Sequence, residues 1–165
     1  MKENTCCFTG HRFIAARDVD PLRELLKKEI AHQAENGRTV FCAGGAMGFD
    51  TIAAECVLEA KKENPDIKLL LFLPHKGQSS SLREADKRRY SEILGSADGV
   101  SYACEEYVQG CMLTRNRQLC DASSVCIAFL EHGSGGTFYT VKYARDHGLQ
   151  IVNLAKRLRG LENEN

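Results

Sequence analysis

Short apolar runs alternate with segments of helical periodicity along most of the chain. The runs are rich in β-branched or aromatic residues and predict six strands, at residues 5–9, 39–43, 67–73, 99–102, 125–130 and 151–154. Between them, apolar residues recur at i, i+3, i+4 and i+7, as in Ala53, Cys56, Val57 and Ala60, and this spacing predicts amphipathic helices. Strands and helices are therefore expected to alternate through the whole sequence.

The predicted strands indicate a parallel sheet. Residues 69–73 read Leu-Leu-Leu-Phe-Leu and are apolar on both faces, which fits a sheet covered by helices on both sides. We expect an α/β fold with a doubly wound, mostly parallel sheet. In such sheets ligands bind beyond the carboxyl ends of the strands, so the loops that follow the strands are the places to search for a site.

Length and charge limit the number of domains and the kinds of partner that the chain is expected to have. The chain has 165 residues, which predicts a single domain over residues 1–160 and a polar tail over residues 161–165. Lys and Arg together number 22 and so do Asp and Glu, and there is no tryptophan; this balance makes a nucleic-acid partner unlikely. No apolar stretch is long enough for a membrane span, so we expect a cytoplasmic protein without a membrane partner.

The cysteines are predicted to be buried core residues rather than metal ligands. There are eight, but no C-x-x-C pair and no Cys/His cluster at zinc spacing. Most lie in apolar runs, which predicts buried free thiols. We therefore expect neither a metal site nor a cofactor.

Two glycine-containing loops follow the first two predicted strands. Thr9, Gly10, His11 and Arg12 combine a tight turn with a cation, and residues 44–50 (Gly-Gly-Ala-Met-Gly-Phe-Asp) place Gly44, Gly45 and Gly48 directly before a helix. Both suit an anion, although a tight turn with close helix packing explains the second loop equally well. Asp50 is either a helix-start residue or a ribose contact.

A third loop of this kind follows the fifth predicted strand and also opens a helix. It consists of Gly133, Ser134, Gly135, Gly136 and Thr137, preceded by His132, which we interpret as a turn residue. Its repetition of the earlier pattern favours an anion or nucleotide site. Neither glycine loop reads G-x-G-x-x-G, and no acidic residue ends the following strand, which disfavours a dehydrogenase.

One predicted helix carries a cation on its apolar face. Met112, Arg115, Asn116 and Leu119 recur at i, i+3, i+4 and i+7. Arg115 is either a guanidinium aimed at a phosphate, with Asn116 beside it, or a structural residue, which packs its stem past the core or pairs with a buried carboxylate. A separate polar segment, Gln78 with the serines at 79–81, precedes another helix as caps or as a lid.

These motifs together resemble the YpsA-like branch of the SLOG superfamily, relatives of the Lonely-guy phosphoribohydrolases and of DNA-processing protein A. The resemblance spans nearly the whole chain and rests on Thr9 to Arg12, Gly44 to Asp50, Arg88-Arg89-Tyr90, Ala97-Asp98, Arg115-Asn116-Arg117, Asp121 and Gly135-Gly136-Thr137. It implies a Rossmann-like fold, a nucleotide or related phosphorylated small molecule as ligand, and a homodimer.

The chain departs from the motif of the phosphoribohydrolase relatives at a position that they need for catalysis. The phosphoribohydrolase relatives read P-G-G-x-G-T-x-x-E, and alignment on Gly136 and Thr137 puts Thr140 in place of their catalytic glutamate. Threonine cannot supply the charge or the base that N-glycosidic hydrolysis needs. We therefore expect a protein that binds a nucleotide or a derivative such as ADP-ribose or NAD, as a ligand sensor. A nucleoside-monophosphate phosphoribohydrolase and a single-stranded DNA-binding module are the alternatives.

Overall fold

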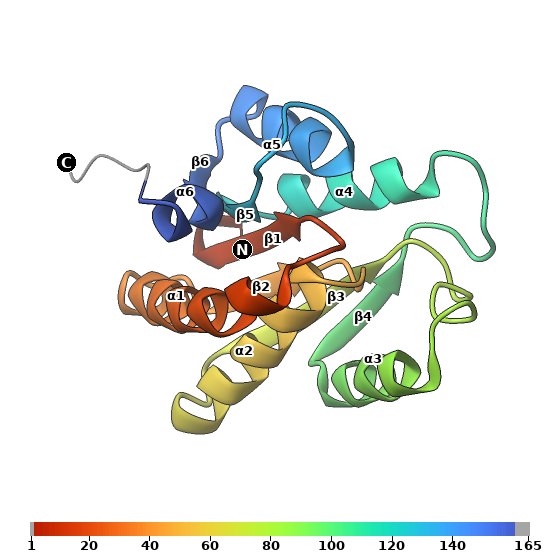
Figure 1. Cartoon of the computed structure of the whole chain (residues 1–165), viewed down its shortest axis with the longest axis horizontal. Coiled ribbons are helices and arrows are strands. Elements are labelled where there is room, and N and C mark those ends of the chain that lie inside the picture. Colours follow the sequence, from red (N-terminus) through yellow and green to blue (C-terminus); the bar gives the residue numbers. More distant parts are fainter. Residues whose placement is uncertain (1, 161–165) are drawn as a thin grey trace.

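The chain folds around one six-stranded parallel sheet in the computed structural model, which describes residues 2–160 (Figure 1). The predicted tail at residues 161–165 lies outside the described residues. The strands are β1 (Thr5–Gly10), β2 (Val40–Ala43), β3 (Lys68–Leu73), β4 (Gly99–Tyr102), β5 (Val125–Phe129) and β6 (Gln150–Asn153). Every pair of neighbouring strands runs parallel, which confirms the predicted doubly wound α/β fold.

Helices cover both faces of the sheet. They are α1 (Ala16–Glu35), α2 (Phe49–Glu63), α3 (Glu84–Ser96), α4 (Cys111–Asp121), α5 (Gly136–Asp146) and α6 (Leu154–Leu158), and a short 3₁₀ turn, η1 (Lys2–Asn4), precedes β1. In Figure 1, α1, α2 and α3 lie together on one side of the sheet, and α4 and α5 lie on the other. The connections that contain α1, α2 and α3 therefore cross one face of the sheet, and those that contain α4 and α5 cross the other face.

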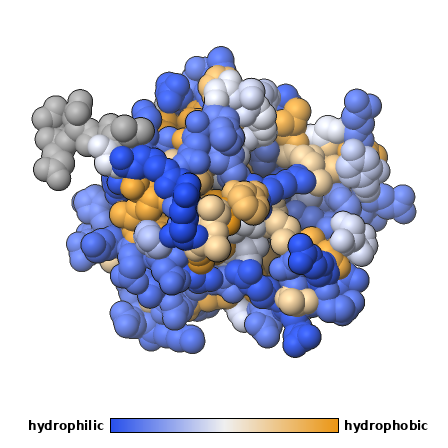
Figure 2. Space-filling view, in the orientation of Figure 1, coloured by the Kyte–Doolittle hydropathy of each residue, from blue (hydrophilic) through white to orange (hydrophobic). Residues whose placement is uncertain are grey.

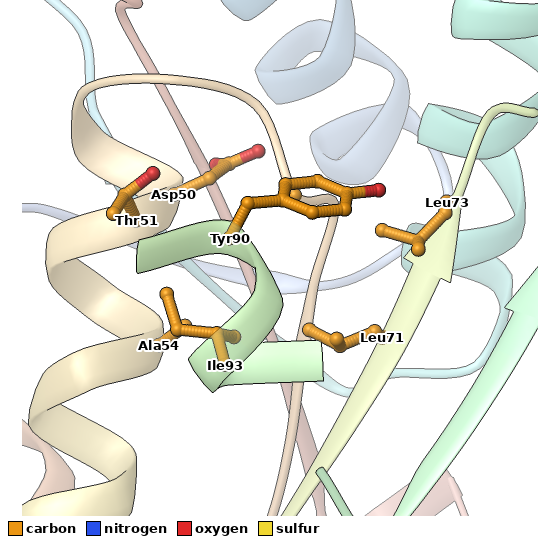
Figure 3. Close-up of a pocket in the computed structure, with 8 residues that line it drawn as sticks. Asp50, Thr51, Ala54, Leu71, Leu73, Tyr90 and Ile93 are labelled. Atoms are coloured by element: carbon orange, nitrogen blue, oxygen red, sulfur yellow. The ribbon is translucent and has the colours of Figure 1, made fainter. Parts of the chain in front are cut away.

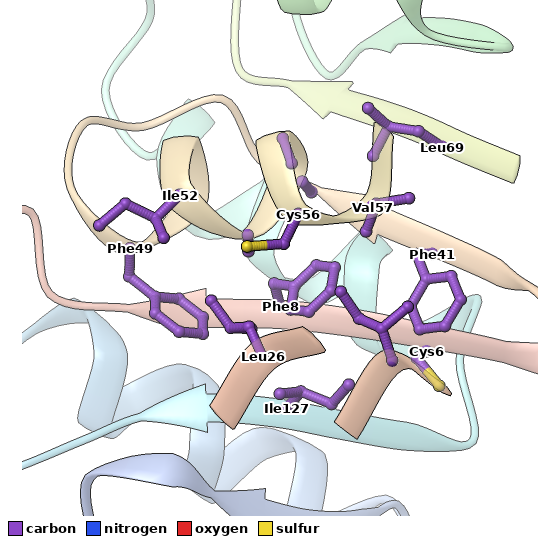
Figure 4. Packing of buried hydrophobic residues seen from close by; sticks show 14 of the residues in the cluster. Cys6, Phe8, Leu26, Phe41, Phe49, Ile52, Cys56, Val57, Leu69 and Ile127 are labelled. Atoms are coloured by element: carbon purple, nitrogen blue, oxygen red, sulfur yellow. The ribbon is translucent and has the colours of Figure 1, made fainter. Parts of the chain in front are cut away.

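Alternate strand residues build two separate cores because successive side chains of a strand point to opposite faces. Phe8 of β1 packs with Phe41 and Phe49 on the α1 and α2 side, at ring-centroid distances of 6.0 and 6.2 Å (Figure 4). Cys7 packs instead on the α4 and α5 side. On the face shown in Figure 2 the surface is mostly hydrophilic, with hydrophobic residues in small groups.

The cysteine prediction is confirmed. All eight thiols are free, and seven are buried, with only Cys104 partly exposed. Burial raises the pKa of Cys6 and of Cys42 to about 12, so these thiols are protonated and unreactive near neutral pH.

Five of the six strands differ by one residue at one or both ends from the sequence-based prediction, and the end of the sixth strand has a clear physical cause. The sixth strand ends at Asn153 rather than at residue 154, because the Asn153 side chain accepts a hydrogen bond from the Ala155 N–H (3.1 Å) and caps α6. The apolar Leu154 is fully buried as the first residue of that helix.

The strand order β4-β3-β2-β1-β5-β6 fixes where a ligand can bind. The chain moves outward from β1 to β4 and then returns to the other side of β1 to form β5. The connections after β1 and β5 therefore leave the sheet in opposite directions, and a crevice forms between them at the carboxyl ends of the strands.

Candidate functional site

A cleft of about 320 Å³ occupies this crevice. It is enclosed by the loops that follow β1, β2 and β5 and by one face of α4. Its lining comprises Phe8, Thr9, Gly10, His11, Arg12, Ala46, Asp50, Met112, Leu113, Arg115, Asn116, Ser134, Gly135, Gly136 and Thr137. The three loops singled out in the sequence thus meet at one place.

Close backbone contacts hold the first two loops together. The Phe49 N–H donates to the His11 carbonyl oxygen (3.1 Å). A Cβ added to Gly10 would lie 2.4 Å from the Phe49 ring, and one added to Gly48 would lie 2.3 Å from the Arg12 carbonyl oxygen. Glycine is required at both positions because any side chain would separate the loops.

Replacing Gly48 by alanine is expected to lower the free energy of unfolding by about 3 kcal/mol, because a strained φ of +75° and a clash with backbone add together. Gly37→Ala is the matched control: its φ is +86°, but a Cβ there meets no atom within 4 Å. The control should lose only about 1–2 kcal/mol. Equal losses in urea unfolding would contradict a tight contact between the loops.

Asp50 is a buried carboxylate on the wall of the cleft. It is 6% exposed, and its Oδ2 accepts a hydrogen bond from the Ala46 N–H (3.2 Å), whereas no hydrogen bond from residues 2–160 reaches Oδ1. Behind it lies a small cavity of about 10 Å³, and Figure 3 shows Tyr90 of α3 extending between Asp50 and Leu73. Burial raises the pKa of Asp50 to about 6, although Arg115 and the Ala46 N–H act in the opposite direction.

Arg115 of α4 lies at the base of the cleft and is 4% exposed. Its Nη1 donates to the carbonyl oxygen of the buried Gly44, and its Nε donates to Asn116 Oδ1 (2.7 Å). Burial lowers the pKa of Arg115, and Asp50 opposes this shift by its negative charge. Arg115 therefore supports the second loop through a carbonyl oxygen rather than through an ion pair with a carboxylate, and it also lines the cleft.

The third loop presents backbone donors. Gly135 has φ +93° and precedes α5, which has no side-chain N-cap. No acceptor within residues 2–160 is present for the N–H groups of Gly135, Gly136 and Thr137. Because the N-terminus of a helix carries partial positive charge, these groups suit an anion in the cleft.

Arg12 is the exposed cation of the site. Its side chain makes no hydrogen bond or ion pair with the described residues. His11 is different: its Nε2 accepts from the Glu131 N–H (2.9 Å), and burial followed by the neighbouring His132 lowers its pKa. The ring is therefore neutral near neutral pH, so the positive charge of the site comes from Arg12 and Arg115.

Four of the predicted residues do not line this cleft. Gly44 lies behind Arg115, and Gly48 lies behind the backbone of Arg12. Gly45 borders a separate hollow beside Leu73 and Gln78, and Gly133 is exposed outside the cleft. The second loop therefore contributes Ala46 and Asp50 rather than its glycines, whose role is close packing.

Some of the lining is not predicted by the sequence. Phe8 and Leu113 carry no sequence signal for a site, and Ala46 is marked only as part of the glycine loop. Leu113 follows Met112 and is 37% exposed, but exposure is not visible in a sequence. Thr140, the residue in place of the family glutamate, is 1% exposed and donates to the Gly136 carbonyl oxygen (2.9 Å), so it does not face the cleft.

The family to which the chain belongs is shown by a match to a protein-family model. The model of the YpsA SLOG family matches residues 13–152. The chain belongs to this YpsA family. The match begins after Arg12, so the family model does not cover the first loop of the cleft.

Curated relatives of this YpsA-family chain carry the name UPF0398 protein. One from Halalkalibacterium halodurans is 29% identical over 57% of this chain and 50% of its own length. One from Ligilactobacillus salivarius is 28% identical over 62% of this chain and 56% of its own length. The matched region thus spans about half the length of these relatives.

Two solved structures share the fold. DNA processing protein A from Helicobacter pylori, whose structure is described with a single-stranded DNA binding mode, aligns with TM-score 0.65 at 19% identity over 96% of this chain and 74% of its own. The protein of the same name from Streptococcus pneumoniae aligns with TM-score 0.66 at 18% identity over 91% and 52%. At these identities the likeness concerns the fold alone.

Within the part of the chain that the structure describes, no group of three or more His, Cys, Asp or Glu side chains could hold a metal ion. Each helix between residues 2 and 160 is too short or too polar to cross a lipid bilayer.

Proposed function

We propose that the protein binds a nucleotide or a nucleotide derivative, of the ADP-ribose or NAD kind, in the cleft between β1 and β5, and acts as a ligand sensor. The observation that carries the proposal is that two sets of hydrogen-bond donors without an acceptor in residues 2–160 border the same cleft. The N–H groups at the start of α5 and the guanidinium of Arg12 both border it, and neither has an acceptor within residues 2–160. A phosphate group would satisfy both sets of donors.

Asp50 supports a nucleotide over a simple phosphate. Its Oδ1 has no hydrogen-bond donor within residues 2–160 and lies on the same cleft. An ionised carboxylate accepts hydrogen bonds only, and a ribose hydroxyl is a suitable donor. The site thus combines groups for a phosphate with a group for a sugar. A homodimer and a cytoplasmic location accompany this proposal as predictions.

Thermal shift with a panel of AMP, GMP, NAD, ADP-ribose and inorganic phosphate tests the proposal. At a ligand concentration 100 times Kd, binding stabilises the folded state by about 2.7 kcal/mol, which raises Tm by roughly 5–10 °C in a chain of this size. At least one nucleotide should raise Tm in the wild type and not in Arg12→Ala.

The control for that experiment is Arg88→Ala, because Arg88 is an exposed arginine of α3 that lies outside the cleft. It should respond like the wild type. A panel in which no nucleotide raises Tm would contradict the proposal, and so would a shift that Arg12→Ala leaves unchanged.

Single-stranded DNA is the second candidate, and the shared fold with DNA processing protein A favours it. A cleft that holds one phosphate could hold a phosphate of a DNA backbone. The two candidates differ in length dependence: an oligothymidylate should bind more tightly than thymidine monophosphate and with a steeper salt dependence if DNA is the ligand. Equal affinities would favour the mononucleotide.

A further inference from the structure

A second hollow adjoins the cleft. It has a volume of about 250 Å³ and shares Arg12, Ala46 and Met112 with the cleft, so these three side chains form the border between the two spaces. The rest of its lining comes from the second loop and from the segment between β3 and α3: Gly45, Met47, His75, Gly77, Gln78, Ser80, Ser81 and Leu82.

The chemistry of this hollow differs from that of the cleft. No carboxylate lines it, and Arg12, at the border, and His75 are its ionisable groups. Three N–H groups of the segment, at residues 78, 80 and 82, donate to carbonyl oxygens within the same segment, so they are not available to an anion. Hydroxyl and amide groups beside methionine and leucine side chains suit an uncharged polar group.

Gln78 is held in a fixed orientation at the wall of the hollow. Its Oε1 accepts a hydrogen bond from the Tyr90 hydroxyl (2.9 Å), and its Nε2 donates to the Gly44 carbonyl oxygen (3.3 Å). Burial raises the pKa of Tyr90 to about 12, so the phenol keeps its proton near neutral pH. A primary amide has two N–H donors, and only one N–H of Gln78 has an acceptor within residues 2–160, so the other can bond a ligand.

We propose that this hollow binds the uncharged half of a two-part ligand, a second ribosyl or nucleoside group joined through a diphosphate that lies across Arg12. The inference rests on the proposed function, because the first half of the ligand occupies the cleft. The two spaces together lie within the usual range for small-molecule sites, roughly 300–1,000 Å³. A dinucleotide or ADP-ribose would fill both, whereas AMP would fill only the cleft.

Isothermal titration with AMP and with ADP-ribose tests the inference on the full chain. The wild type should bind ADP-ribose at least about tenfold more tightly than AMP, a difference of about 1.4 kcal/mol. Ser81→Phe fills the hollow and should reduce the affinity for ADP-ribose to that for AMP, with the affinity for AMP changed less than about twofold. Ser91→Phe, at an exposed position of α3, is the matched control and should behave like the wild type.

Two further variants, which add no bulk to the hollow, test the inference independently of Ser81→Phe. Gln78→Ala should weaken ADP-ribose severalfold and spare AMP, and Tyr90→Phe should have a smaller effect in the same direction because Tyr90 only positions the amide. Equal affinities of the wild type for AMP and ADP-ribose would overturn the second site and leave the proposed function standing. A parallel loss of both ligands in Ser81→Phe would also overturn it. If neither ligand binds the wild type, the proposed function itself fails.

Discussion

Replacing Arg115 by alanine is expected to lower the free energy of unfolding by about 3–5 kcal/mol and to abolish nucleotide binding. The substitution removes one of the two donors to the buried Gly44 carbonyl oxygen, so that only Gln78 Nε2 (3.3 Å) remains. It also removes the arginine that acts most strongly on the Asp50 carboxylate and leaves only the weaker effect of Arg12. Loss of one hydrogen bond from a charged donor alone costs about 1.5–3 kcal/mol. The second loop should then lose its fixed conformation, which explains why binding is lost together with stability.

Two variants serve as controls for this prediction. Arg115→Lys keeps the charge but replaces the two donor nitrogens that bond Gly44 and Asn116 by a single ammonium group, so it should lose less stability than the alanine variant. Arg117→Ala removes the next arginine of α4, an exposed side chain that donates to the Tyr139 hydroxyl (2.9 Å), and should cost less than about 1 kcal/mol. Urea unfolding measures all three. An Arg115→Ala protein as stable as Arg117→Ala would contradict a supporting role for Arg115.

Asp50→Asn is expected to have the opposite effect on stability. At pH 7.5 the wild-type carboxylate is ionised although burial disfavours the charge, and its pKa of about 6 already includes the attraction of Arg115. Replacing the carboxylate by a neutral amide should therefore stabilise the ligand-free protein by on the order of 2–3 kcal/mol at this pH. Nucleotide affinity should fall at the same time, because the amide is a weaker acceptor for a ribose hydroxyl.

The pH dependence gives this prediction a definite sign. The pKa of Asp50 is higher in the folded chain, about 6, than its ordinary value of 3.8, so the folded state binds the proton more tightly between these values. The contribution of Asp50 to stability therefore falls as the pH rises from about 4 to about 6 and is constant above that range. The difference between Asp50→Asn and the wild type should be near zero at pH 4 and largest at pH 7 and above.

Urea unfolding of both proteins from pH 4 to pH 8 measures this difference. Other titrating groups, such as His11, are common to both proteins and largely cancel. A wild type that is more stable than Asp50→Asn at pH 7.5 would refute the assigned role. A residue that lowers the stability of the ligand-free protein but contributes to ligand binding is typical of a binding site.

Local signals in the sequence were enough to predict the fold and the loops that border the cleft. Apolar runs marked every strand, and the strand-to-helix loops at Gly10, Asp50 and Gly136 meet at one cleft as the fold rule requires. The role of each glycine could not be predicted in this way. Gly44 and Gly48 contact Arg115 and Arg12, residues that lie 71 and 36 positions away in the chain, and such contacts exist only after folding.

The second hollow could not be predicted for the same reason. Gln78 was visible only as part of a polar segment that could cap a helix or cover a site. Its hydrogen bonds to Tyr90 and Gly44 join three elements, so its orientation follows from the packing of α3 and the second loop against each other. Helical periodicity did place Arg115 and Asn116 on one face of α4, but not the carbonyl oxygen that Arg115 holds.

Titration of the ¹⁵N-labelled protein with AMP, followed by amide NMR shifts, tests the central claim most directly. The chain is 18.3 kDa, a size at which individual amides are resolved. Binding in the cleft predicts saturable shifts that are largest at the amides of Gly10, Arg12, Gly135, Gly136 and Thr137. The absence of saturable shifts at millimolar AMP, or shifts confined to residues away from these loops, would contradict a nucleotide site in the cleft.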